Sequence, residues 1–409
     1  MADTLKIFIP HCSGLLTDYL PHGDGLVAHG FIARLADRGH RVWVATERVD
    51  LARSLGSNVN AFVINSPAKV SSLNRLNYMR QVRSLFRNLS RSIEFDLIHQ
   101  LNPVYTGVSL ALWGCNIPVV LGPYVADWPY DPDSAVPSHP ILRTVSRQLE
   151  TLVGWLQQQH ASALLLTTEA ARHKLISAKR GNARCYLVPH GIDEAFFSPA
   201  PWLADDDSAG RQRILFLANV SERKGIFELL RAFEIVQSRF PAAELWIAGA
   251  GADLERSRAF ATDLRSRAQI RFLGCKTRAE TVELFRRASI YCLPSHGEPY
   301  GMTVAEAMSC GLPVVVTNAG GVRHIVDEQG GIRVPVQSPQ ALADALSELL
   351  ADPGRRRSMG TQNRAKVLNS MTWDKVIDRL EEVYRLTLQM AQAQPSRPAA
   401  LTASIEDYS

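Results

Sequence analysis

Two glutamates eight residues apart, Glu298 and Glu306, are the side chains of this sequence whose types and spacing best suit ligand chemistry. Glu306 lies in a segment with helical spacing, and its carboxylate can accept two hydrogen bonds from a vicinal diol such as a ribose. Glu298 lies before that segment, in a polar loop that ends at Gly301. There it can face a sugar attached to a phosphate, and one carboxylate at each end of a phosphate suits a nucleotide-sugar.

The elements expected around these glutamates are a strand, a loop, a helix and a second strand. Residues 288–293 form a short apolar run, and residues 302–310 carry apolar residues at helical spacing. Gly311 suits the position that follows a helix, and residues 313–317 form the second apolar run. The first N–H groups of a helix lack partners and carry partial positive charge, so the sequence predicts an anion site after Gly301.

This block resembles the signature of the retaining glycosyltransferases of family four. The resemblance rests on Glu298-x7-Glu306 inside the gapless pattern PSxGEPYGMxxxEAMxxGxPVVxxxxGG, and it extends loosely over residues 5–392. It implies an α/β protein with the GT-B fold, in which two Rossmann-like, doubly wound domains face each other and a C-terminal helix crosses back. The alternative interpretation is a buried strand–helix–strand unit with two solvated glutamates.

The resemblance implies a hexosyltransferase that moves a sugar from a nucleoside-diphosphate sugar to an acceptor hydroxyl with retention of anomeric configuration. Glycan, glycolipid or exopolysaccharide biosynthesis would be its setting. It implies no cofactor and no required metal, because cations of the protein stabilise the leaving diphosphate. The alternatives are a sugar-nucleotide epimerase on the same fold and a catalytically silent sugar-nucleotide-binding subunit. The sequence does not specify donor base, donor sugar, acceptor or oligomeric state.

The resemblance assigns roles to individual positions. Arg223 and Lys224, a basic pair before an expected helix, would stabilise the leaving diphosphate, and Glu298 would orient the transferred sugar. The expected donor-binding residues are Glu306, Gly301, Tyr300, Met302, Thr303, Gly249, Gly251 and Asn219. Gly249 and Gly251 follow an apolar strand, as in a dinucleotide fingerprint, but the third glycine of that fingerprint is missing.

Two positions depart from the family pattern. Asn219 stands where the family often has an arginine, and we assign the role of that arginine to Arg223. Tyr124 stands where the family commonly has a histidine near the reacting sugar. The candidate substitutes for this histidine are His99, His11 and His22. Both departures keep the silent-subunit alternative open.

A glycine-rich turn, Gly23-Asp24-Gly25, precedes a helix expected over residues 26–38, with Asp24 as its N-cap. The turn is either a simple capped turn or a loop that closes on the donor phosphates or holds the acceptor. In the second case, Tyr124 and His99 belong to the same phosphate or acceptor region.

Strands alternate with helices in both halves, which predicts parallel sheets. We expect an acceptor-binding domain at 1–198, a linker at 199–212 and a nucleotide-sugar-binding domain at 213–371. Residues 372–393 are the helix expected to return to the first domain, and residues 394–409 are an expected disordered tail.

Residues 71–92 form an expected helix with apolar residues every three or four positions and five arginines, without one acidic residue. Such a helix either packs on the sheet with a solvated arginine face or lies on anionic lipid, where a lipid-linked acceptor would be found. The expected partners are therefore a nucleotide-sugar donor, a hydroxyl acceptor and, in the second case, an anionic membrane surface.

The composition is that of a globular protein, with 409 residues, 46% hydrophobic and 21% charged. The formal net charge of +5 is too small to indicate a nucleic-acid partner. Six scattered cysteines without a C-x-x-C pair indicate free thiols in a reducing compartment. With no signal-peptide pattern and no apolar run long enough to span a bilayer, the sequence predicts a cytoplasmic protein, peripheral on the inner face of the membrane in the lipid-binding alternative.

Asp131-Pro132-Asp133 is a D-x-D triplet, which some sugar transferases of another fold use to hold a divalent metal. Here it stands in a proline-rich stretch with no neighbouring strand, which favours a solvated turn. No metal site is expected.

Overall fold

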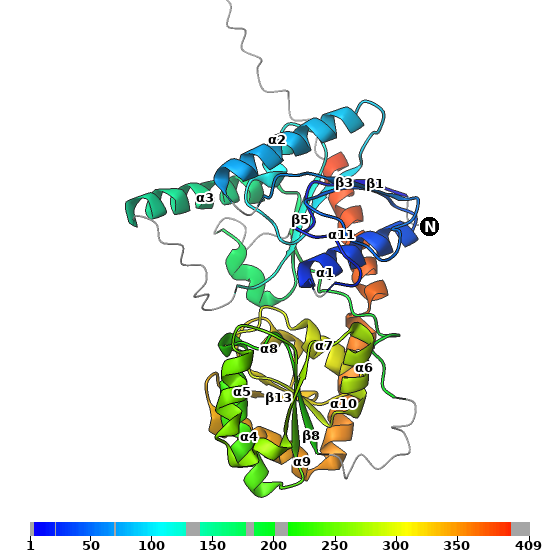
Figure 1. Cartoon of the computed structure of the whole chain (residues 1–409). Coiled ribbons are helices and arrows are strands. Elements are labelled where there is room, and N and C mark those ends of the chain that lie inside the picture. The colour runs from blue at the N-terminus through cyan, green and yellow to red at the C-terminus, as the bar shows by residue number, and fades with distance from the viewer. Residues whose placement is uncertain are drawn as a thin grey trace, which may run out of the picture.

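The computed structural model describes residues 4–20, 22–68, 71–127, 140–176, 184–200 and 212–393. Figure 1 shows two α/β parts, one formed by each half of the chain, with the last described helix returning to the first part. Most of the expected linker, the expected tail and the Asp131-Pro132-Asp133 triplet lie outside the described residues.

In the described part of the N-terminal half, seven strands form one parallel sheet in the order β3-β2-β1-β4-β5-β6-β7. The strands are β1 (Lys6–Ile9), β2 (Arg41–Thr46), β3 (Val59–Val63), β4 (Leu97–Gln100), β5 (Val119–Tyr124), β6 (Ala163–Leu166) and β7 (Cys185–Leu187). The helices are α1 (Gly23–Asp37), α2 (Ser72–Leu89), η1 (Val108–Leu112), α3 (Pro140–His160) and η3 (Glu169–Lys174). The strand order reverses between β1 and β4, which is where parallel sheets bind ligands beyond their strand ends.

The C-terminal half repeats this plan. Its described strands form a six-stranded sheet in the order β10-β9-β8-β11-β12-β13, all paired in parallel. The strands are β8 (Arg213–Leu217), β9 (Glu244–Ala248), β10 (Ile270–Gly274), β11 (Ile290–Leu293), β12 (Val314–Thr317) and β13 (Gly331–Val334). The helices are η7 (Glu222–Lys224), α4 (Ile226–Arg239), α5 (Leu254–Thr262), η8 (Arg265–Gln269), α6 (Arg278–Arg287), α7 (Met302–Ser309), α8 (Val322–Ile325), α9 (Pro339–Ala351) and α10 (Pro353–Ser370). Here the order reverses between β8 and β11.

Helices cover both faces of each sheet, so the central strands are continuous apolar runs and not alternating patterns. On one face of the N-terminal sheet, Ile7 and Val42 pack with residues of α1 and of α11 (Trp373–Ala393). On the other face, Phe8 and Trp43 pack with the buried side of α2. A third cluster fills the C-terminal half. Both halves therefore have a core of their own.

Helix α11 starts where the two chain connections between the halves run side by side. Ile192 N–H donates to the carbonyl of Met371 at 2.8 Å, and Trp373 N–H donates to the carbonyl of Ile192 at 3.3 Å. Farther along α11, Asp378 forms an ion pair of 2.7 Å with Arg38, the residue after α1. The helix that follows the C-terminal half therefore packs into the core of the N-terminal half (Figure 1).

The first helix corrects one expectation. It begins at Gly23, three residues earlier than expected, and its N-cap is His22 and not Asp24. The imidazole Nδ1 of His22 accepts a hydrogen bond of 3.0 Å from Gly25 N–H. Asp24 lies inside the first turn, where a carboxylate interacts favourably with the positive end of the helix. Aspartate is a preferred N-cap residue and histidine is not, so the sequence pattern favoured Asp24.

Candidate active site

The loop that carries Glu298 connects β11 to α7, as expected from the sequence. Gly301 is the N-cap of α7 and has φ 92° and ψ 58°, a left-handed conformation that glycine adopts without strain. The N–H groups of the first turn of α7, which have no partner within the helix, follow directly. Gly311 follows the C-cap Cys310 with φ 78°, which is the expected end of the helix. The loop therefore ends in a helix start that can attract an anion.

The basic pair and Glu298 come together in space. Lys224 Nζ lies 2.5 Å from Glu298 Oε2, and the two side chains are only 13% and 11% exposed. Arg223 and Lys224 occupy the short turn η7 between β8 and α4, on a neighbouring strand of the sheet. Lys224 and Glu298, which are 74 positions apart in the sequence, thus form an ion pair at the carboxyl ends of β8 and β11.

Backbone contacts hold these two loops against each other. Gly225 has φ 76°, and a Cβ atom at this position would lie 2.0 Å from the carbonyl oxygen of Pro294. Only glycine fits such an approach. The N–H of His296 donates a hydrogen bond of 2.8 Å to the carbonyl of Arg223. The basic turn and the Glu298 loop therefore form one unit.

Glu306 lies one turn inside α7 and is partly buried. Burial raises the pKa of its carboxyl group to about 7, and the positive charge of Arg278 offsets part of this effect. The described residues provide its carboxylate with no hydrogen-bond partner. A carboxyl group with this pKa is protonated in about half of the molecules at neutral pH, and hydroxyl groups of a ligand would stabilise its ionised form.

Gly249 and Gly251 have a packing role that the sequence analysis missed. A Cβ atom at position 249 would lie 2.0 Å from the carbonyl oxygen of Ala218, and one at 251 would lie 2.2 Å from that of Val220. The two glycines let the loops after β8 and β9 touch, which is a reason for glycine at both positions beside the expected role in donor binding. Asn219, between the two contacts, is exposed.

Three expected donor-binding residues have intramolecular partners. The Tyr300 hydroxyl is buried and donates to the carbonyl of His190, 3.1 Å away, in the connection between the halves. The Thr303 hydroxyl forms a hydrogen bond of 2.7 Å with the Tyr291 hydroxyl, which itself donates to the carbonyl of Leu217. Met302 packs against the cores of both halves. These contacts anchor the start of α7, and for Tyr300 they replace the expected ligand contact.

Of the three histidines expected as substitutes for the family histidine, His99 is corrected by the structure. His99 is fully buried in β4, where its Nε2–H donates to the carbonyl of Gly122 at 2.9 Å and its Nδ1 accepts from the Tyr384 hydroxyl at 2.6 Å. Burial lowers the pKa of this imidazole to about 4. His11 is likewise fully buried, and His22 caps α1. His99 therefore orders the core beneath α11.

Tyr124, at the end of β5, lines a cavity of about 620 Å³ beyond the carboxyl ends of β4 and β5. Burial raises the pKa of its hydroxyl well above the ordinary value. The remaining lining residues, which the sequence analysis did not identify, are Asn102, Pro103, Val104, Tyr105, Thr106, Val125, Asp127, Glu150, Thr151, Gly154, Gln157, Gln158, Lys174 and Ile176. Asn102 also donates to Asp24 at 3.2 Å, which links this region to the start of α1.

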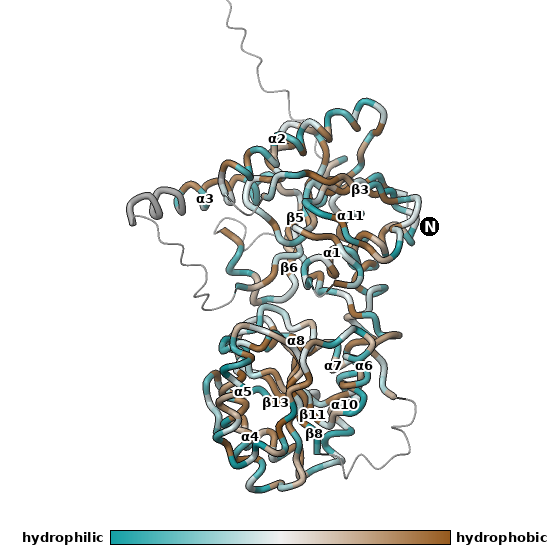
Figure 2. The backbone as a smooth tube through the Cα atoms, viewed as in Figure 1, coloured by the Kyte–Doolittle hydropathy of each residue, from teal (hydrophilic) through white to brown (hydrophobic). Residues whose placement is uncertain are grey.

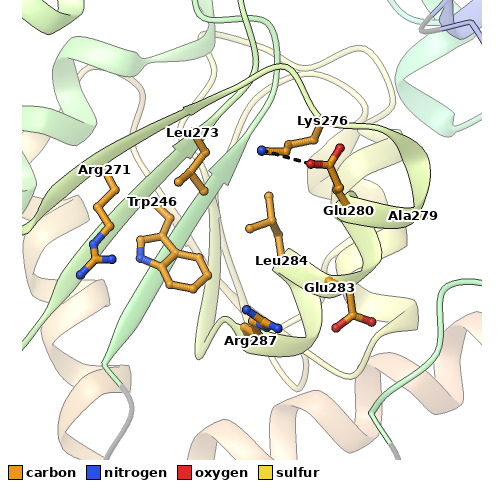
Figure 3. A pocket seen from close by; sticks show the side chains of 9 residues that line it. All are labelled: Trp246, Arg271, Leu273, Lys276, Ala279, Glu280, Glu283, Leu284 and Arg287. Carbon is orange, nitrogen blue, oxygen red and sulfur yellow. Dashed lines mark hydrogen bonds and ion pairs between the residues drawn. The ribbon is translucent and has the colours of Figure 1, made fainter.

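A second cavity, of about 530 Å³, lies at the edge of the C-terminal sheet (Figure 3). Trp246, Leu273 and Leu284 form its apolar wall, and Lys276 forms an ion pair of 3.3 Å with Glu280 at its rim. None of the residues assigned to donor chemistry lines it.

Within the described ranges, no cluster of three or more histidine, cysteine or acidic residues is arranged to hold a metal ion. In those same ranges, no helix is long and apolar enough to cross a bilayer.

Comparisons with known proteins cover both halves. Residues 23–196 match the description Glycosyltransferase Family 4, and residues 206–366 match Glycosyl transferases group 1. The D-inositol 3-phosphate glycosyltransferase of Kineococcus radiotolerans is 31% identical over 57% of this chain and 59% of its own length. The match thus spans less than two thirds of that relative.

The phosphatidyl-myo-inositol mannosyltransferase of Mycobacterium leprae is 30% identical over 76% of this chain and 79% of its own length. Among solved structures, HepE of Anabaena in complex with UDP superimposes with a TM-score of 0.71 at 19% identity, covering 93% of this chain and 100% of that one. At this level of identity the similarity concerns the fold alone. With matches to both halves and a relative this similar over most of its length, the chain belongs to glycosyltransferase family four, the retaining glycosyltransferases of the GT-B fold.

Proposed function

We propose that this protein is a hexosyltransferase that moves a sugar from a nucleoside-diphosphate sugar to an acceptor hydroxyl with retention of anomeric configuration. The observation that carries the proposal is the contact of 2.5 Å between Lys224 and Glu298 beside the start of α7. Lys224 is a cation that can bind a diphosphate, and Glu298 is a carboxylate that can bind a sugar. The two side chains are in contact, and Glu306 lies one turn farther along.

In this proposal the cations stabilise charge that develops on the leaving group. Arg223 and Lys224 bind the diphosphate together with the first N–H groups of α7, and such preorganised donors act strongly in a dry site. Glu298 accepts hydrogen bonds from the transferred sugar, and Glu306 accepts them from the ribose hydroxyls. The backbone around Gly301 approaches the phosphates.

The reaction proceeds on one face of the sugar. The acceptor oxygen forms a bond to the anomeric carbon as the bond from that carbon to the phosphate oxygen breaks. The acceptor proton passes to the departing phosphate oxygen, so no protein base is needed. The residues of the chain bind, orient and neutralise, and neither a metal nor a cofactor takes part.

We assign the acceptor to the N-terminal domain, residues 1–198, and the donor to residues 213–371. The cavity beside Tyr124 supports this assignment, because it lies beyond the carboxyl ends of β4 and β5, where a parallel sheet presents its ligand-binding loops. Its lining carries hydroxyl, amide and paired charged groups. Residues 372–393 tie the two domains together through α11.

We further propose that the acceptor is lipid-linked and that the protein contacts the inner face of an anionic membrane through α2 and α3. Leu73 and Leu76 of α2 are 78% and 50% exposed, and Leu149 and Leu152 of α3 are 59% and 53% exposed. The Arg75–Glu150 ion pair of 3.4 Å places the two helices side by side (Figure 2). Exposed leucines on paired helices suit an interface with lipid.

The positive charge of α2 supports the same surface. Arg80, Arg83 and Arg87 are exposed, whereas Val82 and Phe86 are buried in the core. Only part of the apolar stripe is therefore used for packing, and its exposed leucines at the N-terminal end remain available. The relative from Mycobacterium leprae is named for transfer to phosphatidyl-myo-inositol, a lipid acceptor.

A donor screen tests the proposal. UDP-, GDP- and ADP-linked sugars are first compared by thermal shift, and the donor that binds is then incubated with and without glycolipid acceptors. We expect acceptor-dependent release of the nucleoside diphosphate and a product with retained anomeric configuration. Conversion of the sugar nucleotide without an acceptor would instead indicate an epimerase, and tight binding without any turnover would indicate a silent subunit.

A further inference from the structure

We propose that His296 and Glu228 are a pair of positioning residues that set the place of the diphosphate-binding cations. The inference rests on the proposed donor site and adds two residues to it. Neither residue belongs to the Glu298-x7-Glu306 pair or to the basic pair. His296 precedes Glu298 by two residues, and Glu228 follows Lys224 by four.

The pair connects three segments. His296 Nε2 lies 3.3 Å from Glu228 Oε1, so the loop after β11 is tied to the first turn of α4. The backbone N–H of the same histidine donates to the carbonyl of Arg223 at 2.8 Å. One residue therefore holds the basic turn through its main chain and the helix behind that turn through its ring.

The charge of Glu228 fixes the direction of this contact. Burial works to raise the pKa of the carboxyl group, but hydrogen bonds from His296 and from the backbone of Glu228 itself, with the charges of His296 and Arg231, outweigh it and hold the pKa below the ordinary value. Glu228 is therefore an ionised acceptor, and His296 donates through Nε2–H. The two side chains are 12% and 20% exposed, so water competes little for either group.

Glu228 has a second oxygen, Oε2, that is buried and finds no hydrogen-bond partner among the described residues. A buried carboxylate that is only half satisfied is costly in a helix that packs into a core. An apolar residue of similar size would pack here without this penalty but could not orient the histidine. The pair therefore serves geometry in the adjacent loop more than stability.

The contact between His296 and Glu228 affects the position of the basic turn. The turn Glu222–Lys224 has three residues and ends at a left-handed Gly225, so its position depends on contacts with the neighbouring loops. On its far side, Glu222 N–H donates to Asp253 at 2.7 Å, and on its near side the contact to His296 holds the carbonyl of Arg223. The ring contact with Glu228 fixes the backbone of His296, and through that backbone it fixes the place of Arg223 and Lys224 relative to the start of α7.

Substitutions of His296 that keep or remove its side-chain hydrogen-bond donor test this role. His296→Ala removes it, whereas His296→Gln places an amide N–H near the former Nε2. UDP, GDP and ADP, the leaving groups of common donors, are titrated by calorimetry, and whichever binds the native protein is used. We expect His296→Ala and Glu228→Ala each to weaken binding about tenfold and His296→Gln to stay within about threefold.

The double substitution, His296→Ala with Glu228→Ala, should lose no more than either single change, because both remove the same contact. Glu255→Ala, which breaks an exposed ion pair with Arg258 on α5, is the matched control and should leave binding unchanged. Melting temperatures identify any variant that fails to fold, and the glutamine variant remains informative in that case.

The outcomes separate the two proposals. A native protein that binds neither UDP, GDP nor ADP would overturn the donor site itself. A native protein that binds one of them, with a folded His296→Ala variant that binds it equally well, would overturn only the positioning role. Equal losses for the alanine and glutamine variants would likewise contradict it, since a residue that merely fills space is not rescued by a hydrogen-bond donor.

Discussion

The Lys224 ammonium group and the Glu298 carboxylate lie 2.5 Å apart, although each is assigned to a different part of the donor. In the absence of a ligand the two groups satisfy each other in a largely buried site, where either charge alone would be costly. A bound diphosphate offers Lys224 a stronger anion and leaves Glu298 to the sugar hydroxyls. Ligand binding therefore exchanges one ion pair for two ligand contacts.

Substitutions at this pair should separate binding from turnover. Lys224→Ala removes a charged partner of the diphosphate and should weaken binding of UDP or GDP by about 2–3 kcal/mol. Glu298→Gln removes an anion that competes for Lys224, so it should leave binding of the nucleoside diphosphate equal or tighter while turnover falls. Calorimetry and product release measure the two effects. A folded Lys224→Ala variant with unchanged affinity would refute the assignment.

The raised pKa of Glu306 predicts that the free energy of unfolding depends on pH. Its pKa of about 7 in the folded protein lies above the value of about 4.3 in an unfolded chain. Between these values the folded state holds a proton that the unfolded state releases, so stability should fall as pH rises from about 4 to 7 and then level off. The stability difference between Glu306→Gln and the native protein should therefore grow by up to about 3 kcal/mol, in favour of the variant, from pH 4 to pH 8.

The same group predicts how ligand binding changes with pH. The ionised carboxylate accepts hydrogen bonds from ribose hydroxyls, so the affinity of the native protein for UDP or GDP should rise between pH 6 and pH 8. Glu306→Ala should bind more weakly and lose this rise. An affinity that follows the same pH profile in both proteins would place the titrating group elsewhere.

The donor loop could be predicted from the sequence because its signals are local. Gly301 and Gly311 bracket α7 as their conformational freedom suggested. Apolar runs flanked by glycine and proline mark buried strands in any parallel sheet, so both sheets followed from the alternation of the two patterns.

The errors concern contacts between distant segments. The burial of His99 depends on Tyr384, which is 285 positions away in α11. Tyr300 reaches the connection at His190, and the space around Gly249 is filled by the backbone of another loop. No spacing within one segment reveals such partners. The lining of the cavity beside Tyr124 was missed for the same reason, since it comes from four separate segments.

Trp373 is expected to be the main anchor of α11. A Cβ atom at Gly30 of α1 would lie 2.0 Å from its ring, and one at Gly191 would lie 2.3 Å from it, so the indole fills the space between α1 and the connection. Trp373→Ala should leave a cavity and lower the free energy of unfolding by about 3–5 kcal/mol. Trp113→Ala, at a tryptophan that is 52% exposed, is the control and should change it by less than about 1 kcal/mol. Equal effects in urea unfolding would contradict the anchoring role.

Activity is expected to survive exhaustive chelation. In the proposed mechanism Arg223 and Lys224 supply the positive charge that a metal ion would otherwise bring to the diphosphate. Treatment with EDTA followed by an assay of product formation tests this directly. Asp131→Asn and Asp133→Asn should be fully active, and a strict requirement for a divalent ion that these changes abolish would restore the D-x-D triplet as a metal site.

The contact with anionic lipid is expected to depend on charge at α2. Each arginine near such a surface contributes about 1 kcal/mol, so changing Arg80, Arg83 and Arg87 to glutamate should reduce binding to anionic vesicles at least about 100-fold. Binding of the native protein should also fall steeply with salt, because exposed charges are screened within about 10 Å at 0.1 M. Flotation with vesicles of pure phosphatidylcholine, or with added phosphatidylglycerol, measures both effects.

A matched control separates local from overall charge in this experiment. Arg258, Arg265 and Arg267 are exposed in the C-terminal half, and changing them to glutamate alters the net charge equally. If α2 forms the contact, this control should float like the native protein, whereas Leu73→Ser with Leu76→Ser should weaken binding at every salt concentration because it removes exposed apolar surface. Equal losses in both arginine triples would mean that net charge alone attracts the protein. Equal recovery of the native protein with neutral and anionic vesicles would leave α2 as an ordinary solvated helix and favour a water-soluble acceptor.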